Sequence, residues 1–204
     1  MNSKTTKQEI KIVKIKSNVS SQYIQPFRVF YIQNDKEKKW DFVKTHDSVA
    51  CLLYHTQKDA FLLVKQFRPP VYLHGKCDGF TYEMCAGILD KNKSLEQTMK
   101  EEILEECGYD VALENIEKIT SFYTGVGFAG SRQMLYFTVI DESMKMQEGG
   151  GVEGEEIELF FLSRSEVRNF MYDENKAKTP GVLFAIFWFF ENKLDLFKKI
   201  TSPL

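Results

Sequence analysis

The chain lacks several features that would assign it to a particular class of protein. Its formal net charge is only −2 over 204 residues, so it has no excess of positive charge with which to bind a nucleic-acid backbone. It has four cysteines, and none belongs to a CxxC pair or to a cysteine–histidine cluster with the spacing of zinc ligands. The sequence therefore predicts neither nucleic-acid binding nor a structural zinc site.

The chain also has no hydrophobic run long enough to cross a membrane. The apolar run at residues 182–190 is far shorter than the roughly 20 residues that a membrane span requires, and it predicts a buried helix instead. The first residues, MNSKTTKQEIK, are polar and lack the apolar segment of a signal peptide. We therefore expect a cytoplasmic protein with reduced thiols and no membrane association.

What is present is typical of a globular protein with one main domain. Hydrophobic residues make up 43% of the chain and charged residues 27%, which are ordinary proportions. We expect a small β-annex over residues 1–45 and the main domain over residues 46–204. In the annex, the isoleucines between residues 10 and 15 suggest one strand, and residues 27–32 and 40–43 flank a charged turn and predict a hairpin. Such a small sheet is marginally stable alone, so it must pack on something.

The main domain combines strands with helices, so the expected fold class is α+β. Thr179 and Pro180 predict the start of the last helix, and residues 73–80 are polar and predict a loop. Apolar, partly β-branched runs bounded by turn residues predict strands at residues 48–54, 60–67, 81–86, 116–123, 132–140 and 158–162.

The stretch from Gly87 to Tyr109, GILDKNKSLEQTMKEEILEECGY, predicts a capped helix. Ser94 is a favourable N-cap, and Gln97 three residues later completes a capping-box pattern. Gly108 stands where a left-handed residue would end the helix. The helix therefore spans most of this stretch.

Four carboxylates crowd the second half of this helix. Glu101 and Glu105, like Glu102 and Glu106, are four residues apart, where like charges repel each other, and negative charge near a helix C-terminus opposes the helix dipole. A bound Mg²⁺ or Mn²⁺ would offset both costs, because these ions prefer oxygen ligands. A solvated acidic face is the alternative, and composition and spacing leave both open.

The same residues resemble the Nudix box, the signature of hydrolases that cleave nucleoside diphosphates linked to another group. The family pattern has Gly, five residues, Glu, seven residues, Arg-Glu, a bulky apolar residue, any residue, Glu-Glu, any residue, Gly and a bulky residue. Two positions differ, since Lys93 replaces the first Glu and Glu101 replaces the Arg. Lys93 and Lys100 are nearby cations, but neither stands at the position of that Arg. The chain supplies the pattern in register at Gly87, Glu102, Ile103, Glu105, Glu106, Gly108 and Tyr109.

Five further motifs resemble the nucleotide-sugar diphosphatase branch of that family, with UDP-glucose diphosphatases as the nearest likeness and ADP-ribose diphosphatases next. In chain order they are QFRPPVY at 66–72, YEMCAG at 82–87, GVGFAGSRQ at 125–133, GGGVEGEEIEL at 149–159 and KTPGVLFAIFWF at 178–189. The resemblance implies an α/β/α sandwich with a mixed sheet, and an N-terminal sheet that helps to form a homodimer. It also implies Mg²⁺-dependent hydrolysis of a nucleotide sugar to a nucleoside monophosphate and a sugar phosphate, with Mn²⁺ as a possible substitute.

The resemblance also implies roles for individual residues. Metal ligands are expected at Glu102, Glu106, Glu155 and the carbonyl of Ala86. Catalytic carboxylates are expected at Glu153, as general base, and at Glu105. Contacts with the substrate are expected from Arg68, Glu83, Ser131 and Arg132.

Each role has an alternative that the sequence leaves open. Arg68 follows a strand and can grip phosphate with two parallel hydrogen bonds, but it can equally be a surface residue. Glu83 can form a structural salt bridge, the glycine-rich loop before Ser131 can be an ordinary hairpin turn, and Glu153 can belong to a solvated acidic loop. The departures at Lys93 and Glu101 also fit a nucleotide-sugar binding protein without catalytic activity.

Overall fold

The computed structural model describes residues 10–16, 21, 23–75, 77–89, 92–152 and 154–193. The chain divides into two compact units, Met1–Thr45 and His46–Leu204. We describe each unit by itself.

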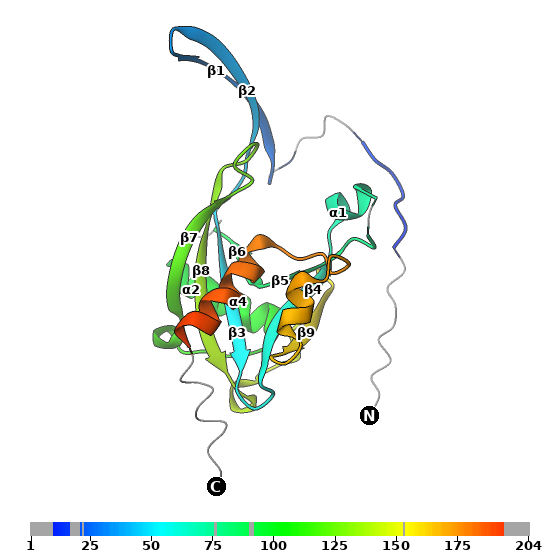
Figure 1. Ribbon diagram of the computed structural model, residues 1–204, viewed down its shortest axis with the longest axis vertical. Coiled ribbons are helices and arrows are strands. Elements are labelled where there is room, and N and C mark those ends of the chain that lie inside the picture. The colour runs from blue at the N-terminus through cyan, green and yellow to red at the C-terminus, as the bar shows by residue number, and fades with distance from the viewer. Residues whose placement is uncertain are drawn as a thin grey trace. The chain divides into compact units, whose positions relative to one another are not determined.

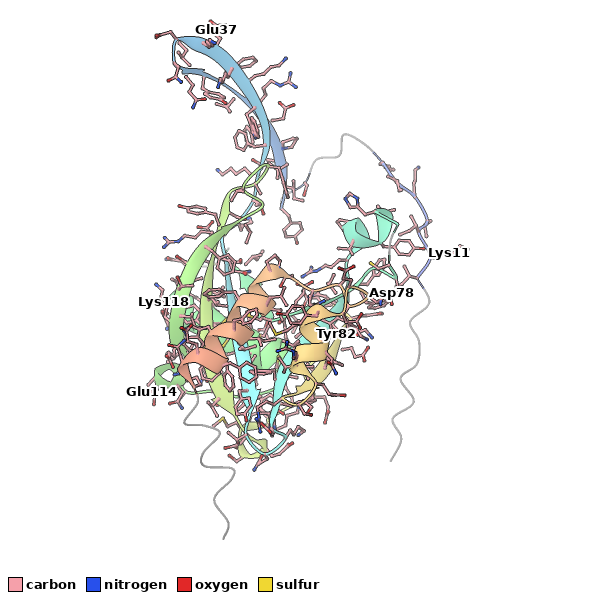
Figure 2. The ribbon with its side chains drawn as sticks, in the orientation of Figure 1. Lys11, Glu37, Asp78, Tyr82, Glu114 and Lys118 are labelled. Carbon is pink, nitrogen blue, oxygen red and sulfur yellow. The ribbon has the colours of Figure 1, made fainter. Side chains whose placement is uncertain are left out.

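The first unit contains an antiparallel hairpin of β1 (Gln25–Gln33) and β2 (Lys36–Lys44). Asn34 and Asp35 connect the strands with φ angles of 53° and 57°, which is the backbone of a two-residue type I′ turn. Side chains stand out from both faces of this ribbon, and Glu37 lies close to its turn (Figure 2). The predicted hairpin is therefore present and is longer than expected.

The prediction of a strand at the isoleucines between residues 10 and 15 is wrong. Residues 10–16 lie outside any strand. Ile12 and Ile15 are an odd number of positions apart, so a pleated strand would point them to opposite faces. Both are exposed in the structure.

The second unit is built on one mixed sheet (Figure 1). Its central path runs β5-β4-β3-β8-β7, while β6 pairs with β3 and β9 pairs with β4. β3 and β8 are parallel, and the other pairs are antiparallel. The strands are β3 (Ser48–His55), β4 (Ala60–Phe67), β5 (Phe80–Glu83), β6 (Cys85–Ile88), β7 (Glu117–Thr124), β8 (Ser131–Ile140) and β9 (Ile157–Ser163).

Helices cover both faces of this sheet, which confirms the predicted α+β sandwich. On one face, α3 (Val167–Tyr172) and α4 (Pro180–Asn192) bury a cluster that includes Leu52, Phe61 and Phe189. On the other face, α2 (Leu95–Glu102) buries a second cluster. Figure 1 shows α4 in front of the strands and α2 behind them. Short turns complete the unit at α1 (Pro69–Leu73), η2 (Leu113–Asn115) and η3 (Glu142–Met144).

Two details differ from the sequence-based expectations. The single strand predicted at residues 81–86 is two strands, because Met84 interrupts it and lets β5 pair with β4 while β6 pairs with β3. The last helix is not buried all round, since Phe184 is 46% exposed and Phe187 is 58% exposed. Only the stripe of α4 that faces the sheet is covered. No helix among the described residues is long and apolar enough to cross a membrane.

Candidate active site

The acidic helix begins as the sequence predicts. The Ser94 side chain accepts a hydrogen bond from the backbone N–H of Gln97, and the Gln97 side chain accepts one from the N–H of Ser94, both at 3.1 Å. These reciprocal bonds complete the capping box. At the other end, Gly108 adopts a left-handed φ of 81°, a conformation that glycine enters without steric cost.

The second half of the helix differs from a regular α-helix. After Glu102 the chain continues as a π-helical turn, Ile103–Cys107, which the sequence pattern does not predict. Such turns are rare and recur at functional sites. This one carries Glu105 and Glu106, and it directs Glu106 inward, where only 6% of the residue is exposed.

Glu106 is held against β6. Its carboxylate accepts a hydrogen bond of 3.0 Å from the backbone N–H of Ala86. Burial raises the pKa of Glu106 to about 8, and the charges of Glu102 and Glu155 add to this rise, although the Cys85 thiol and the Ala86 N–H partly oppose it by donating hydrogen bonds. Because little solvent reaches the Glu106 carboxylate, a cation bound beside it would stabilise its negative charge.

Glu102 lies beside Glu106 and directly over Gly87. A Cβ atom at position 87 would overlap the Glu102 side chain, so only glycine lets the helix residue approach β6 this closely. Gly87 and Glu102, which both belong to the Nudix-box pattern, therefore pack directly against each other. This contact places the carboxylates of Glu102 and Glu106 beside neighbouring residues of the same strand.

A glycine-containing loop closes the C-terminal end of the acidic helix. The N–H of Gly150 donates to the carbonyl of Glu106 at 2.8 Å, and the N–H of Gly151 donates to the carbonyl of Glu105 at 3.3 Å. The side-chain amide of Gln147 donates to the carbonyl of Leu104 at 2.8 Å. Helix ends leave such carbonyls without partners unless other groups donate to them. These donors also reduce the negative charge at the end of the helix where the acids gather.

The same loop continues toward the remaining predicted carboxylates. The Glu155 carboxylate accepts a hydrogen bond of 3.3 Å from the N–H of Val152, so it folds back onto its own loop. Its charge contributes to the raised pKa of Glu106. Glu153, the predicted general base, lies outside the described residues.

Arg68 and Glu83 form a paired group near these acids. Two parallel hydrogen bonds of 2.8 Å and 2.7 Å join the guanidinium to the carboxylate, and Thr81 donates a further hydrogen bond to Glu83. The bond to Glu83, and next the charges of Glu106 and Glu155, raise the pKa of Arg68. The salt bridge considered for Glu83 is thus present, while contacts with a substrate stay predictions.

A cavity of about 360 Å³ opens beside this group on the α4 face of the sheet. Ser131 hydrogen-bonds the hydroxyl of the cavity residue Thr124 at 2.8 Å. Arg132 is next along the strand and points to the opposite face, where it donates to Ser121 at 3.0 Å and 2.7 Å. The structure therefore brings Ser131, but not Arg132, to the cavity side. The lining comprises Ala50, Glu83, Met84, Ala86, Phe122, Tyr123, Thr124, Gly125, Gln133, Thr179, Pro180 and Gly181.

The donor set suits a hard divalent cation. Carboxylates and a nearby backbone carbonyl are the ligands that Mg²⁺ prefers, and burial raises the pKa of the Glu106 carboxyl, so a bound cation would stabilise its charged form. In the described part of the chain, no three acidic, cysteine or histidine side chains already converge as a metal-binding group. The carboxylates would have to draw closer together to share an ion, and Glu106 can keep one oxygen on the Ala86 N–H while its other oxygen binds the ion.

Sequence reasoning missed some residues that shape this site. The cavity residues Gln133 and Tyr123 lie on β8 and β7, and they reach the site through the parallel pairing of β8 with β3, which no local pattern reveals. The loop donors Gln147 and Gly150 had a signal in the glycine run that begins at Gly149, because consecutive glycines often mark backbone in left-handed conformations.

A model of the Nudix domain matches residues 44–181 of the chain. The chain belongs to the Nudix family. It is 38% identical over 200 residues to uridine diphosphate glucose pyrophosphatase NUDT14 of Bos taurus, covering 84% of this chain and 90% of the relative. The corresponding protein of Mus musculus is 35% identical over 199 residues, covering 83% and 89%. A GDP-mannose pyrophosphatase of Pectobacterium atrosepticum is 39% identical over 127 residues, covering 62% and 64%.

These comparisons confirm the family predicted from the box at Gly87–Tyr109 and its nucleotide-sugar branch. These three relatives carry the names of nucleotide-sugar pyrophosphatases. The two departures in the box do not remove the chain from the family.

Proposed function

We propose that this Nudix protein hydrolyses the diphosphate bond of a nucleotide sugar of the UDP-glucose type in a Mg²⁺-dependent reaction. The products would be a nucleoside monophosphate and a sugar phosphate. The buried Glu106 carboxylate, held against Ala86 beside Glu102, is the observation that carries the proposal. The two mammalian relatives of similar length support the substrate class.

Glu102, Glu106, Glu155 and the carbonyl of Ala86 would hold the ion. When bound, Mg²⁺ or Mn²⁺ supplies charge neutralisation for the diphosphate and lowers the pKa of coordinated water. The protein positions the ligands by two contacts described above, namely the Ala86 N–H on Glu106 and the close packing of Glu102 on Gly87.

Other residues would bind the substrate and move protons. Arg68 presents a planar guanidinium that matches phosphate oxygens, and Glu83 holds it in place. Glu153, or Glu105 on the π-helical turn, would accept a proton from the attacking water. The cavity next to Glu83 would accommodate the part of the substrate beyond the diphosphate, with Ser131 at its edge.

A second candidate substrate keeps the chemistry and changes the nucleotide. The relative from Pectobacterium atrosepticum is named for GDP-mannose, and the sequence motifs are also similar to those of ADP-ribose diphosphatases. A panel of UDP-glucose, GDP-mannose and ADP-ribose, assayed with Mg²⁺ and compared by kcat/KM, separates these substrates. Tight binding without hydrolysis of any of them would instead support a binding protein.

Replacing Glu106 by Gln tests the site directly. The amide preserves the shape of the side chain but removes the charge that would face a cation, so we expect Mg²⁺-dependent hydrolysis to fall by at least about 100-fold while the fold is retained. Glu114→Gln, at an exposed position in η2, is the matched control and should hydrolyse at the wild-type rate. A Glu106→Gln enzyme with wild-type turnover would refute the assignment.

We also propose that the protein is a cytoplasmic homodimer. The hairpin β1–β2 supports the dimer, because it is a two-stranded piece that exposes large apolar side chains and needs a covering surface. Among these are Phe30 at 74% exposure and Ile32 at 72%. Closed two-fold dimers are the most common soluble assemblies. A reducing compartment suits the free thiols of the chain.

A further inference from the structure

The two residues that depart from the Nudix box contact each other. The ammonium group of Lys93 lies 2.6 Å from one carboxylate oxygen of Glu101 and 2.5 Å from the other. Both side chains are partly covered, with exposures of 39% and 41%. The family pattern has an acid at the first position and a base at the second, so this chain has the same pair of charges in exchanged positions.

The ion pair joins two parts of the site. Lys93 immediately precedes the N-cap Ser94, at the end of the segment that leads from β6 into α2. Glu101 lies eight residues further, next to Glu102. The bond therefore ties the entry segment to the part of α2 that packs on Gly87.

The pair also neutralises the charge of Glu101 among the other acids. Glu101 is four residues from Glu105, where a free carboxylate would repel it. Lys100, the other cation nearby, does not serve this purpose because it lies 2.8 Å from the carboxylate of Asp110. Among the described residues, Lys93 is thus the cation that pairs with Glu101 and neutralises its charge beside Glu102.

We infer that Lys93 and Glu101 are positioning residues, and that their ion pair carries, in exchanged order, the two charges that the family pattern has at these positions. In this interpretation the two departures form one compensated change that preserves the orientation of Glu102, and they do not indicate a protein that has lost its activity. The inference extends the proposed function, since it concerns the same metal-binding acids. It predicts that substituting either residue affects the site because the ion pair is lost.

A charge-exchange series tests the inference. The variants are Lys93→Glu, Glu101→Arg and the double variant that carries both changes. Mn²⁺ affinity is measured by electron paramagnetic resonance of the free ion, thermal unfolding is followed in parallel, and kcat/KM is measured on UDP-glucose with Mg²⁺. Lys100→Ala breaks the Lys100–Asp110 pair, which is similarly exposed on the same helix, and serves as the control.

Each single variant places like charges together, so we expect Mn²⁺ affinity and kcat to fall by roughly threefold to tenfold. The double variant restores the family's order of charges and should recover both values to within about twofold, which is the signature of direct coupling. Lys100→Ala should leave both values unchanged.

Losses that simply add in the double variant, or a gain of activity in Glu101→Arg alone, would overturn the inference. If the wild type hydrolyses no nucleotide sugar, the proposed function fails, but the Mn²⁺ series still decides whether the pair positions the acids.

Discussion

A single carboxyl group, Glu106, concentrates the electrostatic cost of this site. It lies under the π-helical turn with 6% of its surface exposed, and its hydrogen bond to the Ala86 N–H recovers only part of the hydration that it loses. The charges of Glu102 and Glu155 add to the cost. Such a group is stable when protonated or when it has a positive partner.

The raised pKa of Glu106 predicts how stability depends on pH in the metal-free protein. Its folded pKa of about 8 lies above its ordinary value of 4.5, so the folded state binds the proton more tightly than the unfolded state. This stabilisation is complete below about pH 4.5 and is lost as pH rises to about 8, by up to about 5 kcal/mol. Urea unfolding in EDTA between pH 5 and 8.5 measures it. Glu106→Gln should remove this part of the pH dependence, and parallel curves for the two proteins would contradict the explanation.

At the scale of residues, the sequence predicted local features and missed partners. Ser94 and Gln97 bond each other across three positions, and Gly108 ends the helix by its own backbone conformation, so both ends of the helix could be predicted from local residues. The partners of Glu106 and Glu101 could not, because the contact with Ala86 depends on how β6 meets the helix, and the contact with Lys93 depends on the path of the entry segment.

At the scale of elements, the acidic helix and the glycine loop form one unit. The π-helical turn directs Glu106 inward, and the loop supplies donors to the carbonyls at the end of that turn. Gly149 lies where the two meet, with a φ of +75° and no room for a Cβ beside the carbonyl of Glu106. The loop can therefore reach the helix only if this position is glycine.

Gly149→Ala tests this unit. The new methyl group would meet backbone, which cannot move aside as a flexible side chain can, so we expect a loss of stability of about 2–3 kcal/mol. Gly154→Ala is the control, because Gly154 has a similar φ of +90° but open space around it, and it should cost only about 1 kcal/mol. Urea unfolding at one pH measures both. Equal losses would show that backbone strain, and not the contact with the helix, determines the effect.

The sequence predicted the strands and helices well where the pattern of apolar residues was clear. The hairpin of β3 and β4 has continuous apolar strands and a short turn, and both strands lie within a residue of their expected bounds. The stretch at residues 81–86 was harder, because the break at Met84 comes from pairing with two different strands. Long-range pairing of this kind leaves no local period to detect.

At the scale of the whole molecule, the first unit exposes large apolar side chains on its hairpin. Phe30 and Ile32 are two positions apart, so they project from the same face of β1. Both are more than two-thirds exposed within the single chain. The proposed dimer gives this face a partner.

Charged substitutions on that face test the dimer. Phe30→Lys combined with Ile32→Lys would bury two charges at the proposed interface, so we expect the molar mass from light scattering to fall to that of the single chain of 23.8 kDa. Lys36→Glu, at the end of the same hairpin, changes a charge without touching the apolar face and should leave the mass unchanged. A wild-type protein that already has the mass of one chain would refute the dimer itself.

The bonds from the glycine loop to the acidic helix have one more consequence. The amide hydrogens of Gly150 and Gly151 point into the helix end and not into solvent, so water can replace them with deuterium only when loop and helix separate. Their exchange rates therefore record how often Glu105 and Glu106 lose this support, and they do so at two backbone positions without any substitution in the chain.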